Sequence, residues 1–349
     1  MDTKKYILEI DHLNVEFRVG KRIVHAVNDV NLEVRRGKTL GIVGESGCGK
    51  SVTAHSVLQL LPPNGGVKEG KILFAEKKDE EPLSLETFRR NGKDIRKIRG
   101  QKIAMIFQDP MMSLNPVYSI GKQIMENLKL HEKGISEEEA KHRIIKLLGE
   151  LGIPEPELRY NEYPHQFSGG MKQRVMIAIA MICNPALLIA DEPTTALDVT
   201  IQKQILKLMQ KLRDDHGTSV ILITHNMGIV AEACDDVAVM YMGRVVESGT
   251  IAQIFENPQH PYTRALLKSV PVPGMPEGTE LLSIPGNTPD ASIVFEGCEF
   301  EERCSERCAH CARVHPVSFE CEPGHFVACF VREKELRKGT AGDGKEAEA

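Results

Sequence analysis

The distribution of apolar residues predicts short strands that alternate with helices along most of the chain. Apolar and polar residues alternate over residues 13–19, which is the pattern of a strand with one buried face. Short apolar runs that end in polar residues, as buried parallel strands do, occupy residues 39–43, 103–107, 186–190 and 219–224. This alternation is typical of an α/β domain, in which functional residues lie at the carboxyl ends of the strands.

A helical insertion is predicted between the second and third of these apolar runs. Ser136 and the three glutamates after it form a capping box that opens a helix, and the following apolar residues recur at helical spacing. Those apolar residues are Ala140, Ile144, Leu147, Leu148 and Leu151. We place the helical subdomain at about residues 110–175.

The character of the chain changes after residue 256, where we end the main domain, residues 1–256. Seven prolines between Pro258 and Pro289 interrupt a stretch with little periodicity, which predicts a small, loop-rich region at residues 257–331. Residues 332–349 are charged and rich in glycine and alanine. Because they contain too few apolar groups to offset the entropy lost on ordering, we expect this tail to be disordered.

Composition narrows the possible classes of function. The 44 Lys and Arg residues against 49 Asp and Glu residues give a net charge of −5, so nucleic acid is not an expected partner. The longest mostly apolar stretch, residues 175–183, is far shorter than the roughly 18 residues that a membrane-spanning helix needs. The N-terminus lacks the apolar core of a secretory signal. We therefore expect a cytoplasmic protein that does not itself cross a bilayer.

A phosphate-binding loop follows the strand predicted at residues 39–43. Residues 44–51 read G-E-S-G-C-G-K-S and match the pattern G-x-x-x-x-G-K-[ST]. The glycines let backbone N–H groups converge on phosphate oxygens, Lys50 would bridge the β- and γ-phosphates, and Ser51 would bind Mg²⁺. The predicted ATP-binding positions here are Gly44, Ser46, Gly47, Cys48, Gly49, Lys50, Ser51 and Val52. Cys48 fills an unrestricted position, so we do not assign its thiol a catalytic role.

A second motif places two acidic residues at the end of a buried strand. Residues 187–193 read L-L-I-A-D-E-P, which brings Asp191 and Glu192 to the carboxyl end of the strand. Two adjacent carboxylates need a counter-ion. We expect Asp191 to hold Mg²⁺ through water and Glu192 to polarise the water that attacks the γ-phosphate.

A third motif makes the first 255 or so residues resemble the ATPases of ABC transporters. Residues 167–174 read F-S-G-G-M-K-Q-R, which is similar to the family signature L-S-G-G-Q, although Phe167 and Met171 depart from its commonest letters. The serine and glycines before an apolar helix would present N–H groups and a helix dipole to an anion. The resemblance implies a P-loop NTPase (RecA-like) α/β core with a helical subdomain and an antiparallel β subdomain.

The same resemblance implies roles for further residues. Ser168, Gly169 and Gly170 would contact the γ-phosphate held by the opposite subunit, so that catalysis requires a dimer with ATP between its subunits. Gln108 would sense Mg²⁺, Asp198 would touch the other subunit, and His225 would contact the γ-phosphate. Phe17 would stack on adenine, although its alternation with neighbouring valines fits a core position equally well.

The C-terminal region indicates which branch of the family this is. Residues 257–267 and the segment S-L-N-P at residues 113–116 resemble ATPase subunits of dipeptide and oligopeptide importers, some of whose relatives carry nickel. The resemblance is to the D-type subunit. It implies two permease subunits, a second and related ATPase subunit, and an extracytoplasmic solute-binding protein. The chain would lie at the cytoplasmic face of the cell membrane as a peripheral subunit.

Six of the nine cysteines are crowded into residues 298–329, more than a site with four thiolate ligands needs. In a reducing compartment such crowding indicates a metal or a cluster. Cys298, Cys304, Cys311 and Cys329 resemble the iron-sulfur motif of this branch, which implies a [4Fe-4S] cluster in a small Cys-rich domain. Zn²⁺ and unliganded thiols remain alternatives, and Cys308 and Cys321 are the spare thiols.

We therefore predict an ATPase that converts ATP and water to ADP and phosphate and energises uptake of di- or oligopeptides. The same role for nickel or another small solute is an alternative, as is an exporter. An ABC ATPase that acts on nucleic acid or ribosomes is less favoured, because such proteins typically carry a long coiled coil, a zinc insertion or a second ATPase copy. This chain carries one copy of each motif, and the segment between Lys50 and Ser168 is too short for a long coiled coil.

Overall fold

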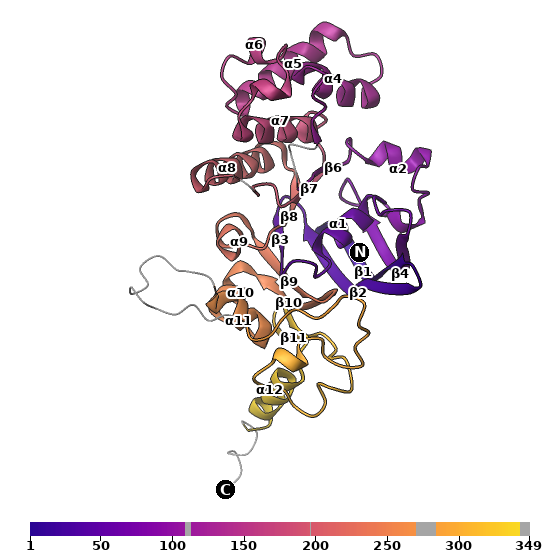
Figure 1. Ribbon diagram of the computed structural model, residues 1–349, viewed down its shortest axis with the longest axis vertical. Helices are drawn as coiled ribbons and strands as arrows, with labels where there is room; N and C mark the ends of the chain where they lie inside the picture. The colour runs from indigo at the N-terminus through magenta and orange to yellow at the C-terminus, as the bar shows by residue number, and fades with distance from the viewer. Residues whose placement is uncertain (109–112, 196, 270–283, 343–349) are drawn as a thin grey trace.

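The computed structural model describes residues 1–108, 113–195, 197–269 and 284–342, with side chains as far as residue 336. The predicted start of the helical subdomain near residue 110 lies outside these residues. Figure 1 shows the helical insertion and the C-terminal helix at opposite ends of the long axis, with a mixed sheet between them and a second sheet at one side.

The larger sheet has eight strands in the order β11-β12-β10-β9-β3-β8-β7-β6. The strands β3, β6, β7, β8 and β9 run parallel, whereas β10, β11 and β12 continue the sheet in antiparallel fashion. Their bounds are β3 Thr39–Val43, β6 Ile103–Ile106, β7 Leu187–Asp191, β8 Ser219–Ile223, β9 Asp236–Tyr241, β10 Arg244–Thr250, β11 Phe319–Glu322 and β12 His325–Val327. The four apolar runs predicted as parallel strands thus form adjacent strands, so their polar ends meet at one edge.

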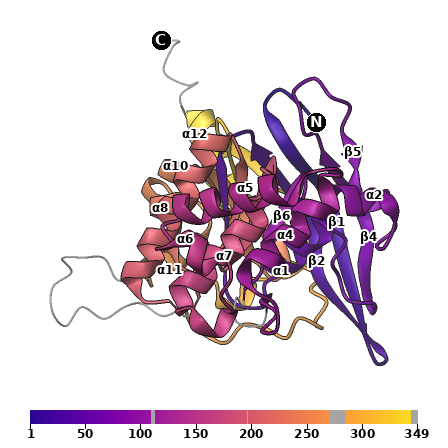
Figure 2. The same ribbon diagram turned by 90° about the horizontal axis from the view of Figure 1, so that it is seen from above.

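The smaller sheet is antiparallel and comprises β2-β1-β4-β5. Its strands are β1 Tyr6–Val19, β2 Arg22–Arg35, β4 Gly65–Phe74 and β5 Leu83–Ser84. Apolar residues of β1, β2 and β4 pack in one cluster with residues of β3, β8 and helix α1. This packing places the antiparallel sheet beside the helix that follows the phosphate loop, as Figure 2 also shows.

Helices cover the parallel part of the sheet and form the insertion. They are α1 Lys50–Val57, α2 Lys93–Ile98, α4 Ile120–His131, α5 Glu137–Glu150, α6 Pro156–Arg159, α7 Gly169–Met181, α8 Val199–His216, α9 Met227–Ala233, α10 Ile251–Glu256, α11 Pro261–Lys268 and α12 Phe330–Gly342. Short 3₁₀ turns are η1 Leu85–Thr87, η2 Pro164–Gln166 and η3 Glu301–Arg303. Helices α4, α5 and α7, which lie between β6 and β7 in the sequence, share one apolar core. Ser136 caps α5 by accepting the N–H of Glu139 at 3.1 Å.

The C-terminal region is joined to the core sheet. Strand β12 pairs with β10, and β11 pairs with β12, so the region adds two strands to the sheet edge. The expectation of a disordered tail is wrong for residues 332–342, which belong to α12. Arg332 holds the start of this helix, because its side chain donates to the carbonyl oxygen of Gln259 at 3.0 Å and lies 3.3 Å from a carboxylate oxygen of Glu306. Residues 343–349 lie outside the described part of the chain.

Among the described residues, no helix combines the length and the apolar character needed to span a bilayer.

Candidate functional site

The phosphate loop connects β3 to α1, and at two of its glycines a side chain would collide with neighbouring backbone. Gly44 has φ +152°, and a Cβ there would lie 2.1 Å from the carbonyl oxygen of Met240. Gly49 has φ +100°, and a Cβ there would lie 2.5 Å from the carbonyl oxygen of Ala26. The Nζ atom of Lys50 donates to the carbonyl oxygens of Gly44 and Glu45, each at 2.8 Å. The ammonium group is therefore held within the loop, where phosphate oxygens would be its ligands.

Ser46, Gly47, Cys48 and Val52 complete the predicted loop positions. Ser46 and Gly47 are exposed, and the space around Gly47 is open. The Cys48 thiol is buried, and its sulfur lies 3.7 Å from Nζ of Lys50. Burial raises the pKa of this thiol, so it is a packed neutral group. Val52 is half-buried against the core that α1 shares with the antiparallel sheet.

The structure brings two of the predicted Mg²⁺ ligands together. The Ser51 hydroxyl donates to Oδ1 of Asp191 at 2.9 Å, and Asp191 is 3% exposed. Burial raises the pKa of Asp191, the expected effect of taking a carboxyl group out of water. Such a pair of oxygen ligands fits Mg²⁺. His55 was not predicted, although it stands one helical turn after Ser51; its Nε2 atom lies 3.8 Å from Asp191.

Glu192 is surrounded by hydrogen-bonding groups from three segments. Its carboxylate accepts hydrogen bonds from Nε2 of Gln108 at 2.9 Å and from the Thr195 hydroxyl at 3.0 Å. Nδ1 of His225 lies 3.0 Å from the same carboxylate. Burial opposes ionisation of Glu192, but the hydrogen bonds from His225, Thr195 and Gln108 outweigh it and lower its pKa. The carboxylate is thus kept ionised and oriented, which a general base requires. Thr195 was missed because a threonine in a turn has no distinguishing sequence signal.

The signature segment at the start of α7 lies beside the loop at the start of α8. Ser168 caps α7 by accepting the N–H of Met171 at 3.3 Å, and Asp198 caps α8 by accepting the N–H of Ile201 at 2.9 Å. A Cβ on Gly169 would lie 3.7 Å from Leu197, and one on Gly170 would lie 2.9 Å from Ile201. Gly170 therefore allows the start of α7 to approach α8, whereas a Cβ at Gly169 would make an ordinary contact.

Phe17 lies near the end of β1, opposite Val24 of β2 and Gly65 of β4. Its ring covers Gly65, where a Cβ would lie 2.2 Å from a ring carbon. Phe17 also packs at the edge of the apolar core shared with α1. The contact with Gly65 gives Phe17 a packing role, and its stacking on adenine stays a prediction.

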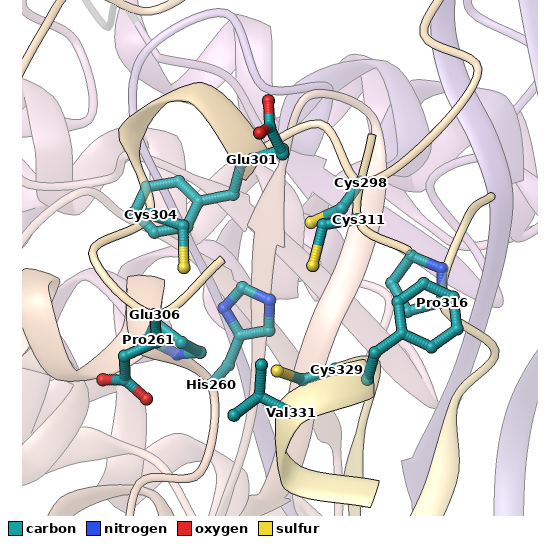
Figure 3. Close-up of a pocket in the computed structure, with 12 residues that line it drawn as sticks. His260, Pro261, Cys298, Glu301, Cys304, Glu306, Cys311, Pro316, Cys329 and Val331 are labelled. Carbon is teal, nitrogen blue, oxygen red and sulfur yellow. The ribbon is translucent and has the colours of Figure 1, made fainter. Parts of the chain in front are cut away.

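The four cysteines singled out in the C-terminal region line one pocket. Cys298, Cys304, Cys311 and Cys329 surround it together with His260, and Figure 3 shows their sulfur atoms grouped around the histidine ring. Burial raises the pKa values of Cys298 and Cys311 to about 12 and about 11. The residues that the structure describes nevertheless include no group of three or more His, Cys, Asp or Glu side chains arranged to hold a metal ion.

The two spare cysteines differ in their positions. The sulfur of Cys308 lies 3.5 Å from that of Cys311, so Cys308 is next to the pocket. The Cys321 thiol instead donates to the carbonyl oxygen of His325 at 3.2 Å, within the hairpin of β11 and β12. Spacing along the sequence could not distinguish these two positions.

Known proteins resemble the chain in sequence and in fold. The ABC transporter family matches residues 27–195, and the family described as the C-terminal region of oligopeptide/dipeptide transporters matches residues 246–311. The chain is 46% identical to the dipeptide transport ATP-binding protein DppD of Bacillus subtilis, over 97% of this chain and 99% of that protein. It is 48% identical to the oligopeptide transport ATP-binding protein OppD of Bacillus subtilis, over 95% and 90%.

The fold matches that of the bacterial ABC transporter cassette MJ0796, solved as a dimer, with a TM-score of 0.61 and 27% identity over 70% of this chain and 98% of that one. The geometry around Lys50, Asp191 and Glu192 agrees with these similarities in sequence and fold. The chain belongs to the ABC transporter family, as an ATP-binding and ATP-hydrolysing subunit of its oligopeptide/dipeptide branch.

Proposed function

We propose that this ATPase energises uptake of di- or oligopeptides, with Glu192 as the base that activates the attacking water. The observation that carries the proposal is the set of donors around Glu192, beside the Ser51–Asp191 pair. The peptide cargo is supported by the names of the relatives, which are dipeptide and oligopeptide transport ATP-binding proteins, and by the match to their C-terminal region.

Each residue of the site has a distinct part in this proposal. Bound Mg²⁺ would neutralise charge on the β- and γ-phosphates, and Ser51, Asp191 and Gln108 would hold it. Lys50 and the N–H groups of the phosphate loop bind and orient the phosphates. Glu192 takes a proton from the attacking water, while His225, 3.0 Å from the carboxylate, would contact the γ-phosphate.

The test of this assignment is Glu192→Gln. The amide keeps the shape of the side chain but cannot take up the proton, so we expect ATP hydrolysis to fall by roughly 10²–10⁴-fold while ATP binding is retained. Binding of a fluorescent ATP analogue and release of phosphate measure the two quantities. Glu232→Gln, at an exposed position of α9, is the matched control and should leave both unchanged. Near-normal hydrolysis by Glu192→Gln contradicts the assignment.

The signature segment supports a second step of the proposal, the action of Ser168 to Gly170 on ATP held by an opposing ATPase subunit. The dimeric form of the cassette MJ0796 supports such a pairing. We propose that this chain is a D-type subunit whose partner is a related ATPase. Ultracentrifugation of the Glu192→Gln protein with ATP should then show a monomer alone and a dimer when the related subunit is present. A stable dimer of this chain alone contradicts the heterodimer.

The complete assembly in this proposal contains two permease subunits, with the chain bound at the cytoplasmic face of the membrane. A solute-binding protein on the opposite side would supply the peptide. The absence of a bilayer-spanning helix among the described residues fits attachment through other subunits. Extraction of membranes with detergent should recover the chain with both permeases. Recovery of the chain with neither permease would contradict this part of the proposal.

The cysteine pocket supports a further proposal, a [4Fe-4S] cluster held by Cys298, Cys304, Cys311 and Cys329. Four thiols from separate segments converge there, and metal binding would release the protons that burial otherwise retains. A cluster or a Zn²⁺ ion would supply a cross-link between these segments. Among the described residues, these side chains are not arranged as a metal site, so the metal content of the protein has to be measured.

Metal analysis of anaerobically purified protein distinguishes the cluster from its alternatives. Four iron atoms per chain and visible absorbance are expected for the wild type, and both should be lost in Cys304→Ser. Cys321→Ser is the matched control, because its thiol is bonded within the β11–β12 hairpin. Zinc without iron, or neither metal, overturns the cluster.

A further inference from the structure

The C-terminal region contacts the phosphate loop directly at Glu45. The backbone N–H of Glu45 donates to the hydroxyl of Tyr262 at 3.0 Å, and Tyr262 is fully buried at the start of α11. The carbonyl oxygen of Glu45 accepts Nζ of Lys50 at 2.8 Å. One residue of the loop thus links the lysine that binds phosphate to a tyrosine more than 200 positions later in the chain.

The side chain of Glu45 is held by the same region. Arg303 at the end of η3 donates to both carboxylate oxygens, at 2.7 and 3.0 Å, and the Thr288 hydroxyl donates at 2.8 Å. The Arg303 side chain is 7% exposed. Burial opposes ionisation of Glu45, but hydrogen bonds from Arg303 and Thr288 outweigh it and lower its pKa. Bidentate pairs of this kind fix position as well as charge.

A packed aromatic group keeps Arg303 and Tyr262 in place. The rings of Tyr241, Tyr262 and Phe300 have centroids 4.7–5.4 Å apart. Arg303 lies over the Tyr241 ring at 5.7 Å and donates to its hydroxyl at 3.2 Å. Tyr262 therefore belongs to an apolar core that β9 and the C-terminal region build together, and Arg303 packs against the same core through Tyr241.

We infer that Tyr262 and Arg303 are positioning residues that hold the phosphate loop in its ATP-binding conformation by fixing Glu45. The inference rests on the nucleotide site under the proposed function. A loop that is already ordered loses less entropy when it binds ATP, and a loop that is ordered only part of the time binds with proportionally lower affinity. Neither residue touches Glu192 or its donors, so the effect falls on nucleotide binding rather than on the hydrolytic step.

The experiment measures ATP affinity and turnover in full-length variants. Arg303→Met removes the bidentate pair, and Tyr262→Phe removes only the acceptor for the Glu45 N–H. Tyr262→Phe should raise the Kd for a fluorescent ATP analogue, and the KM for ATP, about 10-fold, the change that loss of one hydrogen bond of roughly 1.4 kcal/mol produces. Arg303→Met removes two hydrogen bonds and should raise both values at least as much. The value of kcat should stay within about 3-fold. Arg307→Met is the matched control, since Arg307 is 59% exposed and pairs with Glu301.

Further variants separate positioning from a general loss of stability. Arg303→Lys keeps the charge with fewer hydrogen bonds and should give an intermediate Kd. If Arg303 acts through Glu45, the double variant Glu45→Gln with Arg303→Met should bind ATP no more weakly than Arg303→Met alone. Thermal unfolding by circular dichroism checks that each variant is folded.

The outcomes are distinguishable. An unchanged Kd in folded Arg303→Met and Tyr262→Phe, even with a lower Tm, overturns the inference and leaves only a structural role. Additive losses in the double variant overturn the route through Glu45. Lys50→Ala is the reference: if it binds ATP normally, the nucleotide-site assignment itself fails, whereas its loss of binding together with normal Arg303 and Tyr262 variants defeats only this inference.

Discussion

Glu247 holds the C-terminal region against the core sheet, and its replacement should destabilise the fold strongly. Glu247 lies on β10 and is 1% exposed. Its carboxylate accepts the backbone N–H groups of Gln259 at 2.6 Å and His260 at 2.8 Å, and Nε2 of His325 lies 2.8 Å away. Glu247→Ala would leave these three groups without the acceptor.

The expected loss of stability follows from the three groups that would lose their acceptor. A buried donor left without a partner costs about 1–3 kcal/mol, so three of them set a range of roughly 3–9 kcal/mol. Water that enters the space left by the carboxylate reduces the loss, and removal of one member of a buried pair typically costs about 3–5 kcal/mol. We therefore expect the free energy of unfolding of Glu247→Ala to fall by about 3–5 kcal/mol.

The effect should also depend on pH. Burial opposes ionisation of Glu247, but hydrogen bonds from His325 and the backbone outweigh it and lower its pKa below the ordinary 4.5. A lowered folded-state pKa means that the carboxylate stabilises fully above pH 4.5 and loses this contribution as the pH falls through the folded value. The difference between wild type and Glu247→Ala should therefore be full at pH 7 and shrink below pH 4.5.

Urea unfolding followed by circular dichroism measures this prediction, because the chain has no tryptophan to report by fluorescence. Glu256→Ala at the exposed end of α10 is the control and should change the free energy of unfolding by no more than about 0.5 kcal/mol. A loss below about 1 kcal/mol for Glu247→Ala at pH 7 would refute the reasoning from buried donors.

Two other substitutions follow from the geometry of the site. Gly44→Ala should abolish binding of a fluorescent ATP analogue, because its Cβ would lie 2.1 Å from the carbonyl oxygen of Met240; binding within 3-fold of wild type, a margin on the order of 0.6 kcal/mol, contradicts this. Ser168→Ala should lower the free energy of unfolding by about 1 kcal/mol, because it removes the cap of α7. Urea titration measures that loss, and an unchanged midpoint argues against the cap.

The sequence predicted the elements whose pattern is local and periodic. The apolar runs at residues 39–43 and 219–224 became adjacent parallel strands, and Ser136 caps its helix, because burial and capping leave regular marks in the sequence. Strands β11 and β12 were missed, since they are short and lie among prolines and cysteines. Their pairing with β10 depends on the rest of the sheet, which is not visible in a short segment.

The candidate site shows the same difference between local motifs, which can be predicted, and contacts between distant residues, which cannot. Motif spacing predicted Lys50, Asp191 and Glu192. Lys50 begins α1 after β3, and Asp191 and Glu192 lie at the end of β7. The bond between Glu45 and Arg303 joins residues 258 positions apart, so no motif could contain both. The tail expectation failed for a related reason: composition described its low apolar content, but contacts of Arg332 with distant residues order the start of α12.

The pairing of β12 with β10 has a consequence for protein engineering. A chimaera that exchanges the C-terminal region between relatives would have to move β10, α11 and the β11–β12 hairpin as one unit, since a junction near residue 256 separates Glu247 from Gln259 and His260. Deletion of the region would also expose the edge of β10, whose unpaired backbone groups favour association between copies. Reporter tags and fusions are better placed after residue 342, beyond the last described helix.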